Sequence, residues 1–261
     1  MESITLKGKL TDHPLTPSVL SALGVIKEET LSEFHNNSHT ANWQTNFVIW
    51  TTDGYIKTKN KYLGELSLTR RQSGQDEIQI DIEQIYYNAD NVNHRIKAAM
   101  ICRNNLLTSP VSWKLNSDFI SSDNTANENR INFLETAHVD GNDVNITIAN
   151  TSFLRKASGN FTTDWSLFSV IGQLAFDNAL QYEFDLLEGL RRFRKTNRLF
   201  YKAQSELHRF QQIGSGILPY DYWLNDNHQL LMVITGNRAY IPVELISENW
   251  KKRSKAKDDD E

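Results

Sequence analysis

Hydrophobic and polar residues alternate with a period of two along most of the chain after Trp43. In "DEIQIDIEQ", Ile78, Ile80 and Ile82 take every second position, and acidic or amide side chains fill the positions between them. The stretches "GELSLTRR", "VSWKLNSDF" and "DVNITIA" repeat this pattern. Successive side chains of a strand point to opposite faces, so the alternation predicts half-buried antiparallel strands.

Short polar turns separate these runs, such as "SGQD" from residue 73, Asp140-Gly141 and "SGN" from residue 158. Connections this short join neighbouring antiparallel strands and leave no room for crossover helices. Alternation resumes after residue 181 and continues to "AYIPVELI". We therefore expect a mainly β fold, an antiparallel meander of roughly a dozen strands in a barrel-like or two-sheet structure, with a few short helices.

Helical patterns are confined to three short stretches. "TPSVLSALG" opens with Thr16 and Pro17, which are typical of a helix start, and ends at Gly24. "KEETLSEFHNN" predicts a second short helix. "DWSLFSVIGQL" predicts a third, with Asp164 as its N-cap. Its apolar residues recur at helical spacing, at Trp165, Phe168, Ile171 and Leu174.

These patterns divide the chain into three segments. Residues 1–42 form an N-terminal helical or irregular segment, and residues 43–248 form a single β-rich domain. Residues 249–261 contain "KKRSKAKDDDE", a charged run that cannot bury apolar surface, so we expect a disordered tail there.

Composition narrows the classes of function. The chain has 261 residues, of which 39% are hydrophobic and 23% charged, as in a globular protein. Its formal net charge of -4 disfavours nucleic acid as a partner. Cys102 is the one cysteine, so no intramolecular disulfide forms. Its apolar, strand-like surroundings predict a buried, inert thiol rather than a nucleophile.

The chain holds no apolar run near the ~20 residues of a transmembrane helix, and "MESITLKGKL" is not a signal-peptide core. We expect a protein without a membrane span that is periplasmic or secreted after removal of a signal, with a cytoplasmic location as the alternative. The oligomeric state stays open.

Metal and cofactor motifs are weak or absent in the sequence. His35 and His39 in "HNNSH" have the spacing of two ligands on one helix face, but Asn-Asn-Ser is poor helix material and no zincin motif accompanies them. The chain contains no nucleophile elbow, dinucleotide fingerprint or P-loop. We therefore expect neither a metal nor a cofactor.

The basic run "LRRFRKTNRLFYK" stands out in an otherwise acidic protein. One interpretation is a solvated loop with extended cationic side chains. The other is a positive rim, with Arg191 and Arg192, that binds carboxylate or sulfate groups, because the planar guanidinium donates two hydrogen bonds to such anions.

Aromatic residues crowd "GILPYDYWLNDNHQLLMVITGNRAYI", which reads as a hairpin. Strand alternation puts Tyr220 and Tyr222 on one face and Trp223 on the other, where we expect it in the core. Arg238 and Tyr240 likewise share a face. The phenols and the guanidinium then either converge on one pocket, with His208 as a neighbour, or form a structural aromatic cluster.

The segments "TDWSLFSVIGQLAFD", "YEFDLLEGL", "IGSGILPYDYWLND" and "NRAYI", together with the β meander before them, resemble a family of small bacterial β-rich proteins of polysaccharide breakdown. The likeness covers the chain from about Phe47 to Ile241 and is greatest to ulvan oligosaccharide dehydratases. It implies a carbon–oxygen lyase that eliminates water from a uronic acid at the non-reducing end of an acidic oligosaccharide.

Such chemistry needs a base for the C5 proton, an acid for the departing hydroxyl and a cation for the carboxylate. From side-chain chemistry, we expect these catalytic residues: Tyr220, Tyr222, His208 and Tyr240. We expect these residues to bind the substrate: Arg238, Arg191, Arg192 and Trp165.

Two other functions fit the sequence. One is a non-catalytic β-barrel that binds a lipid or other small ligand. The other is a glycoside hydrolase that uses a carboxylate pair, such as Asp185 with Glu188 or Asp221 with Asp226.

Overall fold

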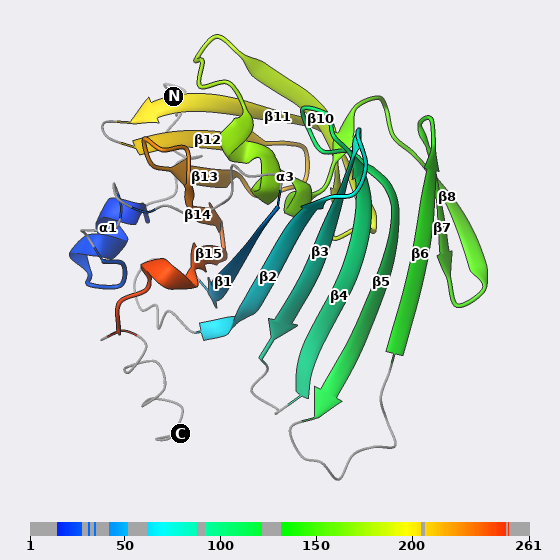
Figure 1. Cartoon of the computed structure of the whole chain (residues 1–261), viewed down its shortest axis with the longest axis horizontal. Helices are drawn as coiled ribbons and strands as arrows, with labels where there is room; N and C mark the ends of the chain where they lie inside the picture. Colours follow the sequence, from blue (N-terminus) through cyan, green and yellow to red (C-terminus); the bar gives the residue numbers. More distant parts are fainter. Residues whose placement is uncertain are drawn as a thin grey trace, which may run out of the picture.

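The computed structural model (Figure 1) describes residues 15–27, 31, 34, 42–51, 62–87, 92–121, 132–204, 207–248 and 250. The helix predicted from "KEETLSEFHNN", the pair His35 and His39, and the charged tail fall largely or wholly outside these residues. The structure therefore tests the fold of the β-rich part of the chain.

Within the described residues, fifteen strands form one sheet, and the expectation of a mainly β fold is confirmed. The first eight strands lie side by side in chain order: β1 (Trp43–Thr51), β2 (Tyr62–Gln72), β3 (Glu77–Tyr86), β4 (Val92–Arg103), β5 (Pro110–Ser121), β6 (Asn132–Asp140), β7 (Asp143–Ile148) and β8 (Thr151–Lys156).

The second half of the sheet runs back to the first. Its strands are β9 (Phe161–Thr162), β10 (Gln181–Glu188), β11 (Arg192–Gln204), β12 (Leu207–Ile213), β13 (Tyr220–Leu224), β14 (Leu230–Thr235) and β15 (Arg238–Pro242). Strand β15 pairs with β1, so β8 and β9 lie at the two ends of the strand order. The sheet curves into a barrel-like shape (Figure 1).

The period-two pattern decides which face of the sheet is buried. In β3 the isoleucines at alternate positions are buried, whereas the side chains between them are exposed or only partly buried. Residues directly opposite each other in an antiparallel pair point to the same side, so apolar rows cross the strands. One such row joins Ile80, Met100 and Trp113 on β3, β4 and β5, all three buried.

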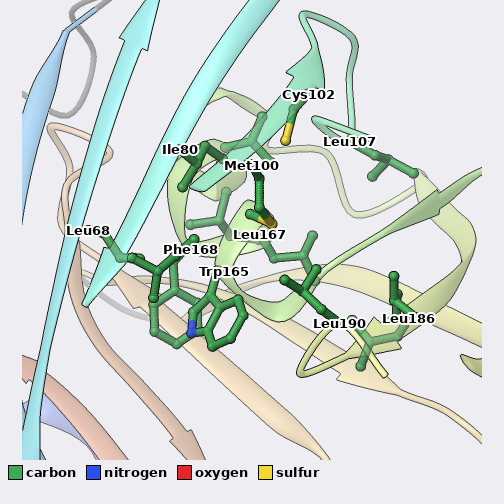
Figure 2. Close-up of a cluster of buried hydrophobic side chains, with 14 of the residues drawn as sticks. Leu68, Ile80, Met100, Cys102, Leu107, Trp165, Leu167, Phe168, Leu186 and Leu190 are labelled. Carbon is green, nitrogen blue, oxygen red and sulfur yellow. The ribbon is translucent and has the colours of Figure 1, made fainter. Parts of the chain in front are cut away.

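Helix α3 (Asp164–Val170) fills the concave side of this sheet (Figure 1) and continues as the 3-10 helix η2 (Ile171–Gln173). Figure 2 shows its Trp165, Leu167 and Phe168 packed among apolar side chains of both halves of the sheet. The apolar face predicted for this helix is confirmed. Its N-cap is Thr163 rather than Asp164, because the Thr163 side chain accepts the hydrogen bond from the backbone N–H of Ser166.

A second apolar cluster covers the opposite face of β1 and β13–β15. Helix α1 (Pro17–Ala22) contributes Leu20, and the 3-10 helix η3 (Val243–Leu245) contributes Leu245. The helix start predicted at Thr16 is confirmed, since its hydroxyl oxygen accepts from the N–H of Val19. Gly24 follows the helix with a φ of +70°, a conformation that glycine adopts without strain.

The aromatic stretch near the C-terminus forms three strands instead of one hairpin. Strand β14 lies between β13 and β15, so a whole strand separates Tyr220 from Arg238. The register still aligns them, because Thr235 is opposite both residues. The alternation holds as predicted: Trp223 is buried in the second cluster, and Tyr220 and Tyr222 belong to the concave side.

The basic run is also regular structure. From Arg192 onward it forms strand β11 rather than a loop, and three of its arginines lie close to glutamates, in the pairs Arg191–Glu135, Arg194–Glu188 and Arg198–Glu183. Cys102 is fully buried on β4, and burial raises the pKa of its thiol to about 12. An inert thiol, as predicted, follows from that pKa.

Candidate functional site

A cavity of about 350 Å³ opens on the concave side, where α3, the end of β10 and the strands of both halves of the sheet meet. Its aromatic wall consists of Tyr86, Trp165, Tyr220 and Tyr240. Its ionisable groups are His94, Asp164, Glu188, Arg191 and Arg238. This combination of rings and charged groups is the main candidate for a functional site among the described residues.

The two sides of the cavity come from distant parts of the chain. Tyr86 at the end of β3 lies opposite His94 on β4, and the two rings are 6.3 Å apart. Gly64 on β2 permits this arrangement, because a Cβ at that position would collide with the carbonyl oxygen of Ile85. The close approach of β2 to β3 therefore depends on a glycine and helps to place Tyr86.

Arg238 reaches across from β15 to this wall. Its Nη1 donates a hydrogen bond to the Tyr86 hydroxyl at 2.9 Å, and its guanidinium carbon lies 4.9 Å from the centre of the Tyr86 ring. A further hydrogen bond joins it to Tyr240. Within the described ranges, no carboxylate forms an ion pair with Arg238, although its side chain is largely buried.

The phenols of the cavity remain protonated at neutral pH. Burial raises the pKa of Tyr86, Tyr220 and Tyr240, and for Tyr220 the nearby carboxylates Asp164 and Glu188 raise it further. Burial dominates over the opposing effect of Arg238 in each case. Each hydroxyl is thus a neutral hydrogen-bond donor and acceptor rather than a phenolate.

Asp164 begins helix α3 and lines the same cavity. Burial raises the pKa of its carboxyl group to about 6, and the charge of Glu188 raises it as well. Hydrogen bonds from the backbone N–H groups of Gly189, Asp164 and Trp165 oppose this shift. The Gly189 N–H lies 3.4 Å from Oδ1. Asp164 therefore changes charge near neutral pH, unlike an ordinary aspartate.

The other charged groups of the cavity have partners outside it. Glu188 accepts a hydrogen bond from Nε of Arg194 at 2.9 Å. Nε of Arg191 lies 3.6 Å from Oε2 of Glu135, and its guanidinium stacks on Phe133 at 4.2 Å. These contacts leave Arg238 and Asp164 as the charged groups of the cavity without an opposite charge in contact, within the part of the chain that the structure describes.

His94 is a neutral ring in this setting. Its Nε2 lies 2.7 Å from Oγ of Ser117, and its ring stacks on Phe119 at 4.7 Å. Burial and the charge of Arg191 lower its pKa, and Asp118 opposes them. The imidazole therefore offers hydrogen bonding rather than positive charge at neutral pH.

Of the residues predicted from sequence, the structure brings five together in the cavity: Trp165, Arg191, Tyr220, Arg238 and Tyr240. The others are not among its lining residues: Arg192, His208 and Tyr222. Tyr222 is fully buried, and its hydroxyl donates to Oε1 of Gln212 at 2.9 Å. It lies beside Tyr220, with 6.3 Å between ring centres, but on the side of the core.

His208 belongs to a separate group. Its Nδ1 lies 2.6 Å from the Tyr201 hydroxyl, and its Nε2 lies 3.4 Å from Asp226. The rings of Phe176 and His228 pack against it. This cluster joins β11 and β12 to the turn before β14, and none of the members named here lines the cavity.

The carboxylate pairs predicted from spacing have structural partners. Asp185 accepts hydrogen bonds from the backbone N–H groups of Ser158 and Thr196, at 2.6 Å and 3.3 Å. Asp221 is buried, with Nη2 of Arg209 at 2.8 Å. The cavity itself contains a different pair, Asp164 and Glu188.

Sequence reasoning missed three residues that line the candidate site. Tyr86 and His94 lie at paired strand ends whose register no local pattern reveals. Asp164 was assigned only a capping role, although its place at the start of an otherwise apolar helix was a usable signal. A carboxylate that begins a buried helix is itself drawn toward the interior, where its pKa changes.

Comparison with known proteins identifies the fold alone. No protein-family model matches the chain, and no curated protein matches it. A crystal structure of a β-barrel-like protein of domain of unknown function DUF1849 from Brucella abortus is similar, with a TM-score of 0.51 and 8% identity. The match covers 80% of this chain and 98% of that protein. Both chains thus share a barrel-like β architecture.

Two kinds of feature are absent from the described residues. No cluster of three or more His, Cys, Asp or Glu side chains there has the proximity needed to hold a metal ion. None of the helices in those ranges has the length and apolarity required to cross a membrane.

Proposed function

We propose that this protein is a β-barrel-like binding protein that holds a small polar ligand in the cavity between α3 and the two halves of the sheet. The observation that carries the proposal is the cavity wall itself. Tyr86, Tyr220 and Tyr240 supply ring faces and neutral hydroxyls, and Arg238 supplies hydrogen-bond donors on a side chain that they hold in place.

The chemistry of this wall favours a polar ligand over a lipid. A lipid site is expected to be apolar and free of charge, whereas this cavity contains Asp164, Glu188, Arg191 and Arg238. Aromatic faces beside hydrogen-bonding groups suit a compact ring that carries hydroxyl or carboxyl groups. The volume of about 350 Å³ is near the lower end for small-molecule sites and suits one such ring.

Calorimetry and thermal shift with a panel of monosaccharides, sugar acids and small aromatic acids test the proposal. Tyr220→Phe removes one hydroxyl from the wall and is expected to weaken binding of a positive ligand by roughly three- to tenfold. The matched control is Tyr182→Phe, since Tyr182 is also half-buried but lies outside the cavity. Equal loss in both variants, or no ligand in the panel, would contradict the proposal.

A second candidate function is the carbon–oxygen lyase that the sequence resemblance implies. The observation in its favour is that Asp164, with a pKa of about 6, shares the cavity with Arg238 and the protonated phenols. Arg238 would neutralise the uronate carboxylate, and the Asp164 carboxylate would take the C5 proton. The C4–O bond then breaks as the C4–C5 double bond forms, and a Tyr220 or Tyr240 hydroxyl protonates the leaving group as water.

Ultraviolet absorbance distinguishes the two functions. A lyase produces an unsaturated uronate from uronate-terminated oligosaccharides, so absorbance rises with time, and Asp164→Asn stops the rise. A binding protein retains the oligosaccharide unchanged. Flat absorbance with a measurable affinity would eliminate the lyase and leave the binding function intact.

A further inference from the structure

We infer that the ligand of this cavity carries a carboxylate that binds Arg238, and that its binding is coupled to proton uptake by Asp164. This inference rests on the proposed binding function and adds the ligand class and the control of affinity. It follows from Arg238 and Asp164, the two charged groups of the cavity that have no opposite charge in contact among the described residues.

Arg238 supplies the first step. A guanidinium that is largely removed from water is normally paired with an anion, because desolvation of an unpaired charge is costly. Other arginines with mostly buried side chains follow this rule, since Arg194 bonds Glu188 and Arg209 bonds Asp221. Arg238 instead contacts neutral phenols, Tyr86 and Tyr240, within the ranges that the structure describes. An anion from outside would complete its coordination.

The hydrogen-bond donors around Arg238 indicate which kind of anion binds there. The guanidinium is planar and donates in a fork that matches the two oxygens of a carboxylate. The hydroxyls of Tyr86 and Tyr220 remain protonated and can donate to the same oxygens, whereas that of Tyr240 donates to Tyr86. One unpaired guanidinium balances one negative charge, so a carboxylate fits better than a doubly charged phosphate.

Asp164 supplies the second step, because its charge works against such a ligand. The groups that face it are Glu188 and the Gly189 N–H from the end of β10, Tyr220 and Tyr222 from β13, and Tyr86 from β3. Glu188 adds a second negative charge, and no cation contacts Asp164 among the described residues. A bound carboxylate therefore favours the protonated form of Asp164, which can also donate a hydrogen bond.

The sign of the pH dependence follows. Below about pH 6 Asp164 is mostly protonated and the carboxylate binds without repulsion. Above that pH, binding is accompanied by proton uptake from solvent, so affinity falls as pH rises. One pKa unit of coupling corresponds to about a tenfold change in affinity between the two limits. His94 and Arg191 line the same cavity, and neither gains a negative charge over this range.

Isothermal titration calorimetry with two matched pairs of probes tests the inference: glucuronate with glucuronamide, and benzoate with benzamide. The acid and the amide of each pair differ in charge but hardly in shape. We expect the acid to bind at least about tenfold more tightly than its amide near pH 5, and by a smaller factor near pH 8. For a coupling of one pKa unit, titration in buffers of different ionisation enthalpy is expected to show uptake of about 0.4 proton per bound ligand near pH 7.

Single-residue variants test which side chains cause the preference for the acid and the pH dependence of binding. Arg238→Gln is expected to abolish the preference for the acid, and Asp164→Asn to abolish both the proton uptake and the pH dependence. Glu183→Gln is the control, because Glu183 is an exposed carboxylate outside the cavity. The proton count on the wild-type protein needs no variant and stands even if one of them fails to fold.

The possible results distinguish a failure of this inference from a failure of the proposed binding function. Equal affinity for acid and amide, tighter binding of inorganic phosphate, or binding without proton uptake would overturn the inference while the binding function survives. No binding of any of the four probes would overturn the inference for these ring carboxylates, and the wider ligand panel would then decide the function.

Discussion

Asp164 is expected to make the folded protein less stable as pH rises, and Asp164→Asn is expected to remove that dependence. The carboxyl group lies in a cavity where burial and Glu188 disfavour its charge. Asparagine keeps the size and the acceptor oxygen that faces the Gly189 N–H, but it does not ionise. The variant therefore isolates the cost of the charge.

The magnitude follows from the pKa of the folded protein. Burial raises the pKa of Asp164 from 3.8 to about 6, a difference of about two units. Each unit corresponds to about 1.4 kcal/mol, so the shift is worth roughly 3 kcal/mol. Because the folded pKa is the higher one, this stabilising contribution is fully present below about pH 4 and is lost as pH rises through about 6.

Urea denaturation followed by tryptophan fluorescence measures the effect in the absence of ligand. The free energies of unfolding of wild type and Asp164→Asn should be similar near pH 4. Near pH 8 the variant should be more stable by up to roughly 3 kcal/mol. Glu135, whose pKa burial also raises, is present in both proteins and cancels in the difference. A difference that is the same at both pH values would refute the reasoning.

Three other predictions concern the interior. Asp221→Ala should lower the free energy of unfolding, measured by urea denaturation, by roughly 3–5 kcal/mol, because it leaves the Arg209 charge buried without its carboxylate. A decrease under 1 kcal/mol would show that water replaces the carboxylate. Tyr222→Phe should lower the free energy of unfolding by about 1–2 kcal/mol, because it removes the hydrogen bond to Gln212, and it should leave ligand affinity unchanged. A large drop in affinity without a loss of stability would mean that the hydroxyl contacts the ligand. Cys102 should react with a thiol reagent only in the unfolded protein, and rapid labelling of the native protein would contradict its burial.

Much of the β architecture was accessible from the sequence because strand faces are a local property. The alternation in "DEIQIDIEQ" predicted the buried side of β3 correctly, and the same reasoning separated Trp223 from Tyr220 and Tyr222. The errors were local as well. The basic run of residues 190–202 was interpreted as a possible loop, because its polar residues hide a strand whose inner side includes Asn197 and Leu199, both fully buried.

The candidate site was accessible only in part. Arg238, Tyr220 and Tyr240 were found because they crowd one stretch of sequence, and the register of β13–β15 keeps them aligned. Tyr86 was not found, although it holds the arginine, since 152 positions separate the two residues in the chain. His208 is close to Tyr220 in sequence, yet the path of β12 carries it to another cluster.

By itself, the sequence determined the strands, the side of the sheet to which each residue points, and the apolar face of α3, because backbone geometry imposes these on neighbouring residues. Only the tertiary structure decided which strand ends meet around the cavity. The curvature of the sheet and the pairing of distant strands bring Tyr86, Asp164 and Arg238 together. Their ionisation also depends on that enclosure, because an aspartate acquires a pKa of about 6 through burial beside Glu188 and not through its place in the chain.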